Sequence, residues 1–141
     1  MLRTCTSCGK NNRLPAARVA DTGRCGACKA ELPALAEPLD VDSAEFKEIV
    51  STVKVPVLVD FWAGWCGPCR MVAPTVSRVA RDLAVKAIVL KVNSERHPDL
   101  AQLFRVRGIP NFAVLKDGDL VLQQSGVVSH QQLKRWLTEA T

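Results

Sequence analysis

The chain has 141 residues, of which 48% are hydrophobic and 23% are charged, and it contains six cysteines. This composition fits one globular domain with a small appendage, and it argues against disorder over most of the chain. No uninterrupted apolar run approaches the roughly 18–20 residues of a membrane helix, so we expect no membrane partner. No apolar stretch follows the basic Arg3, so we recognise no secretory signal and expect a cytoplasmic protein.

The net charge of +5 is unevenly distributed, because residues 1–30 hold six basic residues and one acidic residue and account for the whole excess. Basic segments often bind nucleic acid or acidic partners, so a binding module is one hypothesis for this segment. The segment has no aromatic residue that would stack on bases, which favours a protein partner over nucleic acid.

The first 30 residues show no strand or helix period, and glycines surround their cysteines. We expect this segment to bury little apolar surface. Pro33 and Pro38, with small residues between them, are typical of a linker. The pattern predicts a module at residues 1–32, a linker at 33–38 and a domain at 39–141.

Helix and strand patterns alternate from residue 39 onward. A helix is predicted over 42–53, with Asp42 or Ser43 as its N-cap, and a continuous apolar run at 55–63 is typical of a strand buried on both faces. The later predicted elements are a helix from WCGPC to about Ala84, a strand at KAIVLKVN, a short helix at HPDLAQLF, a hairpin around Asp117-Gly118, and a final helix capped by Ser129. The order βαβαβαββα predicts an α/β fold, with a mixed sheet covered by helices on both faces.

The sequence WCGPC places Cys66 and Cys69 where the predicted buried strand gives way to a helix. Unpaired backbone N–H groups and the helix dipole stabilise a thiolate there and lower the pKa of its thiol. Cys69 follows one helical step later, near enough for a disulfide. A buried structural pair or half of a metal site is the alternative, but a metal would need two further ligands nearby. We favour a redox pair in which one cysteine attacks and the other resolves.

Asp60 is a carboxyl in an otherwise apolar strand, six residues before Cys66. Burial disfavours the charged form, so we expect a raised pKa and a group suited to proton transfer. An exposed aspartate on an edge strand is the alternative, and the flanking VPVLV argues against it.

The other four cysteines form two pairs, Cys5-x2-Cys8 and Cys25-x2-Cys28, separated by sixteen residues. This spacing fits a four-cysteine zinc site. A 30-residue segment with little core needs such a staple. A zinc tetrathiolate carries net negative charge, so the basic residues around it have a local explanation.

Residues 39–141 resemble the thioredoxin family through VLVDFWAGWCGPC, the later RGIP and the FAVLKDG hairpin. The resemblance implies a central mixed sheet flanked by helices and the reduction of protein disulfides. It also implies that an NADPH-dependent thioredoxin reductase supplies the electrons.

The same resemblance assigns roles to single residues. It makes Cys66 the nucleophile and Cys69 the resolving thiol, with Asp60 accepting the proton of Cys69 and Lys91 as the basic neighbour of Asp60. The resemblance also places Ile109-Pro110, with a cis peptide bond, against the cysteines. The expected substrate-binding residues are Trp65, Gly67, Pro68, Ile109 and Pro110. The sequence departs from the family at Gly64, where proline or a larger residue is common, and at Asn111, where threonine is usual.

A basic CxxC…CxxC module ahead of such a domain resembles the zinc-containing bacterial thioredoxins of the thioredoxin 2 group. This implies one zinc ion held by Cys5, Cys8, Cys25 and Cys28, in a structural or an oxidant-sensing role. We expect a monomer that reduces disulfide-containing proteins. The alternative functions are a binding protein with secondary redox activity, and an oxidase or isomerase of disulfides.

Overall fold

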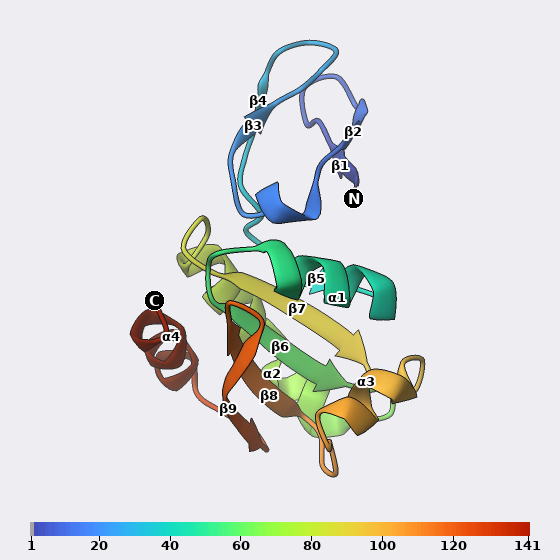
Figure 1. Ribbon diagram of the computed structural model, residues 1–141, viewed down its shortest axis with the longest axis vertical. Coiled ribbons are helices and arrows are strands. Elements are labelled where there is room, and N and C mark those ends of the chain that lie inside the picture. Colours follow the sequence, from blue (N-terminus) through green and yellow to red (C-terminus); the bar gives the residue numbers. More distant parts are fainter. Residues whose placement is uncertain (1) are drawn as a thin grey trace.

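The computed structural model describes residues 2–141. Figure 1 shows a small N-terminal part of loops and short hairpins beside a larger part built on one twisted sheet. Among the helices of residues 2–141, none is both long and apolar enough to cross a membrane.

The sheet of the larger part has five strands in the order β5-β7-β6-β8-β9. Strands β5, β7 and β6 run parallel, whereas β8 and β9 each pair antiparallel with the preceding strand in that order. The strands are β5 (Leu39–Asp40), β6 (Val57–Trp62), β7 (Ile88–Asn93), β8 (Asn111–Lys116) and β9 (Asp119–Ser125). The predicted mixed sheet is therefore confirmed, with the apolar run of β6 at its centre.

Four helices cover the two faces of this sheet. The helices are α1 (Ser43–Thr52), α2 (Gly67–Asp82), α3 (Pro98–Leu103) and α4 (His130–Glu139). Buried residues of α1 and α3 share one apolar core with one face of the sheet, and α2 and α4 share a second core with the other face. The predicted cover on both faces is thus confirmed.

The helix ends follow from local sequence. Asp42 accepts the backbone N–H of Glu45 at 2.8 Å, and Glu45 accepts the N–H of Asp42, which makes a reciprocal capping box on α1. Ser129 accepts the N–H of Gln132 and caps α4, as the sequence predicts.

Each outer cysteine pair lies at the tip of a two-stranded hairpin. The first hairpin joins β1 (Leu2–Thr4) to β2 (Asn11–Arg13), and the second joins β3 (Gly23–Arg24) to β4 (Glu31–Leu32). Between the hairpins lies the 3-10 helix η1 (Ala16–Arg18). Strands of two or three residues carry too little periodicity for sequence reasoning to detect.

The segment around η1 packs on the larger part of the protein. Ala16, Val19 and Ala20 are buried and belong to the same apolar core as Phe46 and Ile49 of α1. The expectation that the first 30 residues bury little apolar surface is therefore wrong for this segment. Figure 1 shows the N-terminal part on the α1 side, with the arrowhead of β6 pointing away from it.

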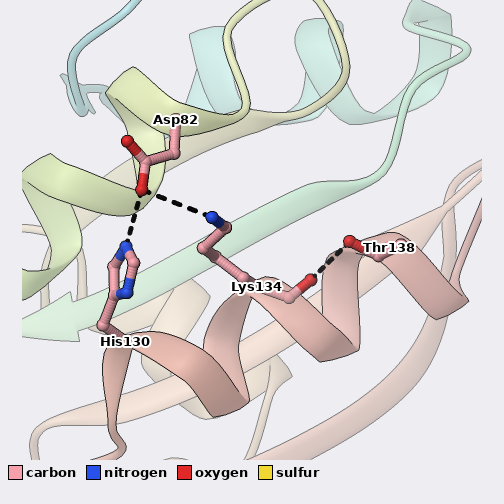
Figure 2. A network of polar contacts seen from close by, with 4 residues as sticks. All are labelled: Asp82, His130, Lys134 and Thr138. Carbon is pink, nitrogen blue, oxygen red and sulfur yellow. Dashed lines mark hydrogen bonds and ion pairs between the residues drawn. The ribbon is translucent and has the colours of Figure 1, made fainter.

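A polar contact joins the end of α2 to the start of α4. Asp82 accepts hydrogen bonds from His130 Nε2 at 2.8 Å and from Lys134 Nζ at 3.4 Å (Figure 2). The hydrogen bond from His130 and the positive charge of Lys134 hold the pKa of Asp82 below its ordinary value. The contact therefore favours the packing of α2 against α4 while Asp82 is ionised.

Candidate functional site

The central cysteine pair lies at the start of α2, immediately after the carboxyl end of β6. Cys66 is the N-cap residue, and its Sγ accepts the backbone N–H of Cys69 at 3.2 Å. Gly67 and Pro68 form the first turn, where proline costs no hydrogen bond. Cys66 and Cys69 form a disulfide, with their Cα atoms 5.3 Å apart. The helix start thus supplies the N–H group that stabilises a thiolate when the bond is reduced.

A loop from the other side of the sheet meets this pair. The Ile109-Pro110 peptide bond is cis, as expected, and the Ile109 carbonyl oxygen lies 3.7 Å from Cys66 Sγ. The carbonyl of Pro110 accepts the backbone N–H of Gly126 at 2.8 Å, which ties the loop to the end of β9. The disulfide is therefore enclosed between the first turn of α2 and this loop.

Little of the disulfide itself reaches the surface, but apolar side chains beside it do. Cys66 is 3% exposed, whereas Trp65 is 69% exposed and Met71 is 74% exposed. Exposed aromatic and methionine side chains are typical of protein-binding surfaces. The surface next to Cys66 is therefore suited to an unfolded or extended segment of another protein.

Asp60 lies in the middle of β6, where it is 1% exposed, and its Oδ1 has no hydrogen-bond partner within residues 2–141. Burial raises the pKa of this carboxyl to about 7, although the positive charge of Lys91 acts in the opposite direction. The expected raised pKa is confirmed. A group that titrates near neutrality can accept a proton from a thiol and return it to solvent.

Lys91 faces Asp60 across the sheet, because the two residues are register partners on β7 and β6. Asp40 of β5 is the register partner of Lys91 on its other side. The three side chains form a row of alternating charge, and the negative charge of Asp40 contributes to the raised pKa of Asp60. The sequence did not reveal that Asp40 pairs with Lys91, because a lone aspartate beside a predicted linker does not show which residue of a neighbouring strand lies opposite it.

The four outer cysteines come together at the two hairpin tips. Their four Sγ atoms lie within 4.8 Å of one another, and the Cys5–Cys28 and Cys8–Cys25 sulfur pairs are each 3.6 Å apart. Tetrahedral coordination at a Zn–S distance of about 2.3 Å would place sulfurs roughly 3.8 Å apart. The cluster therefore fits one Zn²⁺ ion, with Cys5 and Cys25 buried and Cys8 and Cys28 exposed.

Asn12 links the two hairpins beside this cluster. Its Nδ2 donates to Cys25 Sγ at 3.5 Å and to the carbonyl of Lys10 at 3.1 Å, and its Oδ1 accepts the backbone N–H of Gly26 at 2.8 Å. The backbone N–H groups of Cys28 and Ala27 lower the pKa of the Cys25 thiol to about 6, and Asn12 adds to that effect. Sequence reasoning missed Asn12, because nothing in the pair Asn11-Asn12 shows which of the two reaches the other hairpin.

A redox-capable cysteine pair that begins a helix, on a mixed sheet covered on both faces, defines a thiol–disulfide oxidoreductase of the thioredoxin fold. The Thioredoxin family model matches residues 37–139, and the model described as Thioredoxin 2, N-terminal matches residues 4–30. The chain therefore belongs to the thioredoxin family, with the N-terminal four-cysteine ribbon of thioredoxin 2.

Individual relatives agree with this assignment. The chain is 35% identical to Thioredoxin C-3 of Corynebacterium nephridii over 139 residues, which cover 99% of this chain and 94% of that protein. It is 41% identical to a thioredoxin of Pseudomonas aeruginosa over 99 residues, or 70% of this chain and 92% of the relative. A solved mutant thioredoxin from Halobacterium salinarum superposes with a TM-score of 0.72 at 32% identity, covering 78% of this chain and 96% of that one. The first of these likenesses includes the N-terminal ribbon, whereas the other two leave part of the chain uncovered.

Proposed function

We propose that this protein is a protein-disulfide reductase that works through Cys66 and Cys69 and is itself reduced by an NADPH-dependent thioredoxin reductase. The observation that carries the proposal is the Cys66–Cys69 disulfide at the N-terminus of α2, beside exposed Trp65. An alternative direction, net oxidation or isomerisation of disulfides, is disfavoured by the Gly-Pro dipeptide, which the strongly reducing thioredoxins share.

The reaction transfers two electrons to the substrate in two exchanges. The Cys66 thiolate attacks one sulfur of a substrate disulfide, which forms a mixed disulfide and releases the other sulfur as a thiolate. Cys69 then gives its proton to Asp60 and attacks Cys66 Sγ. The second substrate sulfur leaves as a thiolate, and the Cys66–Cys69 disulfide remains on the enzyme. In this scheme the positive charge of Lys91 limits the rise of the Asp60 pKa. Asp60 can therefore release the proton to solvent after each turnover.

Substrate recognition is assigned to the surface around the disulfide. Trp65, Gly67, Pro68, Ile109 and Pro110 are proposed to contact the substrate, which pairs as an extended segment along the loop at Ile109. Exposed Trp65 and the position of Ile109 beside Cys66 support this assignment. Buried Asn111, which accepts a hydrogen bond from Gln123 at 2.9 Å, would affect this surface only through the loop.

The trapping experiment separates the two cysteines. A reduced Cys69→Ser variant should accumulate a covalent complex with disulfide-bonded insulin, because Cys66 can attack the substrate disulfide but the mixed disulfide cannot be resolved. Cys66→Ser should form no such complex. Equal trapping by both variants, or turnover by either with NADPH and a bacterial thioredoxin reductase, would contradict the proposal.

The four outer cysteines are proposed to hold one Zn²⁺, which would staple the two hairpins together. Zinc supplies a fixed tetrahedral centre there, and Asn12 with the N–H of Ala27 positions Cys25 for it. The cytoplasm is the proposed compartment, because a reducing environment keeps such thiols available to metal. We propose that the protein acts as a monomer.

A second function, sensing of oxidants, is favoured by the exposure of Cys8 and Cys28 within this cluster. Peroxide would convert two thiols to one disulfide while it is reduced to two water molecules, and the metal would lose two ligands. Native mass spectrometry before and after a stoichiometric peroxide pulse tests this. Zinc loss together with a disulfide in residues 1–30 supports sensing. Retained zinc, with only the Cys66–Cys69 bridge formed, leaves the metal structural.

A further inference from the structure

The three chain segments that build the redox site contain basic residues and no acidic ones. Residues 61–81 carry the cysteines and most of α2, residues 100–116 carry the cis-proline loop and β8, and residues 120–138 carry most of β9 and α4. None of these segments contains an aspartate or a glutamate, although residues 31–141 as a whole hold as many acidic as basic residues. Positive charge is therefore concentrated on the segments around the redox pair.

Two exposed arginines lie on the elements that meet at Cys66. Arg70 follows Cys66 by four residues and donates its backbone N–H to the Cys66 carbonyl at 3.3 Å, so the two residues are neighbours on one side of the helix. The Cα–Cβ bond of a helical residue tilts toward the N-terminus of its helix, which is the end that carries Cys66. Arg107 lies two residues before Ile109, whose carbonyl oxygen is 3.7 Å from Cys66 Sγ.

Neither arginine is neutralised within the protein. Among the ion pairs of residues 2–141, none involves Arg70 or Arg107. One unpaired arginine on a surface would mean little, because water solvates it. Here one unpaired arginine comes from the first turns of α2 and the other from the facing loop, so a substrate that reaches the disulfide approaches both.

The acidic residues at this end of the sheet lie on its other side. Glu95 and Asp99 follow β7, and β7 and β8 flank β6 from opposite sides. Asp99 also accepts a hydrogen bond from Ser43 Oγ at 2.9 Å, which ties it to α1. Asp117 and Asp119 lie at the opposite end of the sheet, because β8 runs antiparallel to β6. A substrate segment on the cis-proline loop therefore lies on the basic side of the site.

Positive charge at this place favours one class of substrate. Carboxylates beside a substrate disulfide repel an attacking thiolate, and they also destabilise the thiolate that leaves. Arginines on both sides of the reacting sulfur offset these two effects and attract an acidic segment during encounter. A disulfide in an uncharged or basic segment gains neither advantage.

We propose that Arg70 and Arg107 direct this protein to disulfides that are flanked by aspartate or glutamate residues. The inference rests on the proposed reductase function and names the substrate class of the same site. The two exchanges at Cys66 and Cys69 are unchanged, and the arginines form and break no bond. Nucleic acid is another anionic partner for such a surface, but it offers no disulfide to the redox pair, which favours an acidic protein segment.

Two disulfide-bonded peptides test the proposal, one with glutamates beside its cysteines and the other with lysines at the same positions. The reduced full chain is mixed with excess peptide, and tryptophan fluorescence gives the second-order rate constant of its oxidation. Each value is divided by the rate constant of the same peptide with 2-mercaptoethanol, an uncharged thiol, at the same salt concentration. This normalisation removes the intrinsic difference in reactivity between the two disulfides.

The normalised rate should favour the acidic peptide by about tenfold at low salt, as expected from a few exposed charge pairs. The preference should shrink when sodium chloride shortens the Debye length from about 10 Å at 0.1 M to about 3 Å at 1 M.

Variants assign the preference to the two arginines. Arg70→Gln and Arg107→Gln should each lower it about threefold, and the double variant should nearly abolish it. Both peptides meet the same Cys66, so a change in the reactivity of its thiolate cancels from the ratio. Lys47→Gln is the matched control, because it removes one positive charge from an exposed position on α1 and should leave the preference intact.

The outcomes separate this inference from the function on which it rests. Equal normalised rates, or equal losses of preference in Lys47→Gln and Arg70→Gln, would overturn the inference and leave the reductase function standing. If neither peptide oxidises Cys66 and Cys69, the reductase function is contradicted, and the inference with it. If the preference is absent and a single-stranded oligonucleotide slows the oxidation by both peptides, the surface binds nucleic acid and the proposal is wrong.

Discussion

Asp60 shows how one residue can be unfavourable for folding and useful for chemistry. Its carboxyl is enclosed between strands of apolar residues, so the ionised form lacks the solvation that it has in the unfolded chain. The folded pKa of about 7 therefore lies well above the ordinary value of 3.8. Between these two values the folded state binds the proton more tightly, so the free energy of unfolding falls as pH rises from about 4 to about 7.

Asp60→Asn should consequently stabilise the protein above pH 7. The shift sets a ceiling of about 4 kcal/mol, and the gain should be smaller because the amide stays buried and polar. Urea denaturation at pH 8 and pH 5 measures this. The advantage of the variant should shrink at pH 5, where the unaltered carboxyl is protonated in the folded state. Equal differences at the two pH values would contradict a buried, pKa-shifted Asp60.

The same substitution should slow one step of the reaction. Without the carboxylate to accept the Cys69 proton, the mixed disulfide should resolve more slowly, by about 10²–10⁴-fold if the full effect of a general base is lost. The attack by Cys66 should keep its rate. Rapid acid quenching of a single turnover with a disulfide peptide follows both steps, with Asp119→Asn on exposed β9 as the control. If the variant resolves the mixed disulfide at the unaltered rate, Asp60 is not the proton acceptor of Cys69.

Asn12 offers a residue-scale test of the cysteine cluster. Partners that orient a metal ligand typically contribute 10–100-fold to metal affinity, so Asn12→Ala should weaken zinc binding by about that factor. Competition with a chromophoric chelator measures the affinity. Asn11→Ala is the matched control, because the Asn11 side chain bonds Thr4 and not the cluster. Equal affinities of the two variants would show that the hydrogen bonds of Asn12 do not support the metal site.

At the scale of elements, the long periodic segments were predictable and the short ones were not. The buried run at 57–62, the helical stripe after Cys66 and the capped final helix all carry their own hydrophobic pattern. The hairpins β1–β2 and β3–β4 do not, because the geometry of the cysteine turns organises them more than packing does. The pairing of Asp40 with Lys91 depends on strand register, which no local pattern specifies.

In the candidate site, too, local sequence motifs were predictable, whereas contacts between distant elements were not. The CxxC spacings located the six cysteines, and the family resemblance supplied the loop at Ile109-Pro110. His130 lies in a polar stretch that gives no sign of a partner, yet it donates a hydrogen bond to Asp82 of a different helix. Contacts between elements distant in sequence depend on the packed arrangement, and a single sequence does not encode them in readable form.

The contact of Asp82 with His130 and Lys134 should make the packing of α2 and α4 sensitive to acid (Figure 2). Asp82 has a lowered pKa in the folded state, so its contribution to stability is present above about pH 4 and is lost as pH falls through the folded value. Asp82→Asn should lower the urea midpoint at pH 6, and the difference should shrink as the pH falls below about 4. Asp119→Asn should show no such convergence. A difference in urea midpoint between Asp82→Asn and the unaltered protein that stays constant with pH would show that the charge of Asp82 does not contribute to stability.

At the scale of the molecule, the N-terminal ribbon and the larger domain share one apolar core. The segment that joins the two hairpins carries Val19, which is 1% exposed and packs in the core that includes Phe46 of α1. Leu35, within the segment expected to be a linker, is 8% exposed and belongs to the same core. The metal cluster and the sheet are therefore connected by packing as well as by the chain, although the ribbon lies away from the end of β6 (Figure 1).

Removal of zinc should for this reason destabilise the larger domain too. Without the metal the hairpins lose their staple, the segment between them is released, and the core around Phe46 loses part of its cover. Thermal unfolding of the full chain, followed by tryptophan fluorescence with and without a chelator, should show a lower Tm without metal. Val19→Ser should lower the Tm with metal present and reduce the further effect of the chelator, because the docking is already weakened. Val127→Ser changes a valine that is 54% exposed and should leave the chelator effect intact. If the chelator leaves the Tm unchanged, the ribbon folds and unfolds independently of the domain.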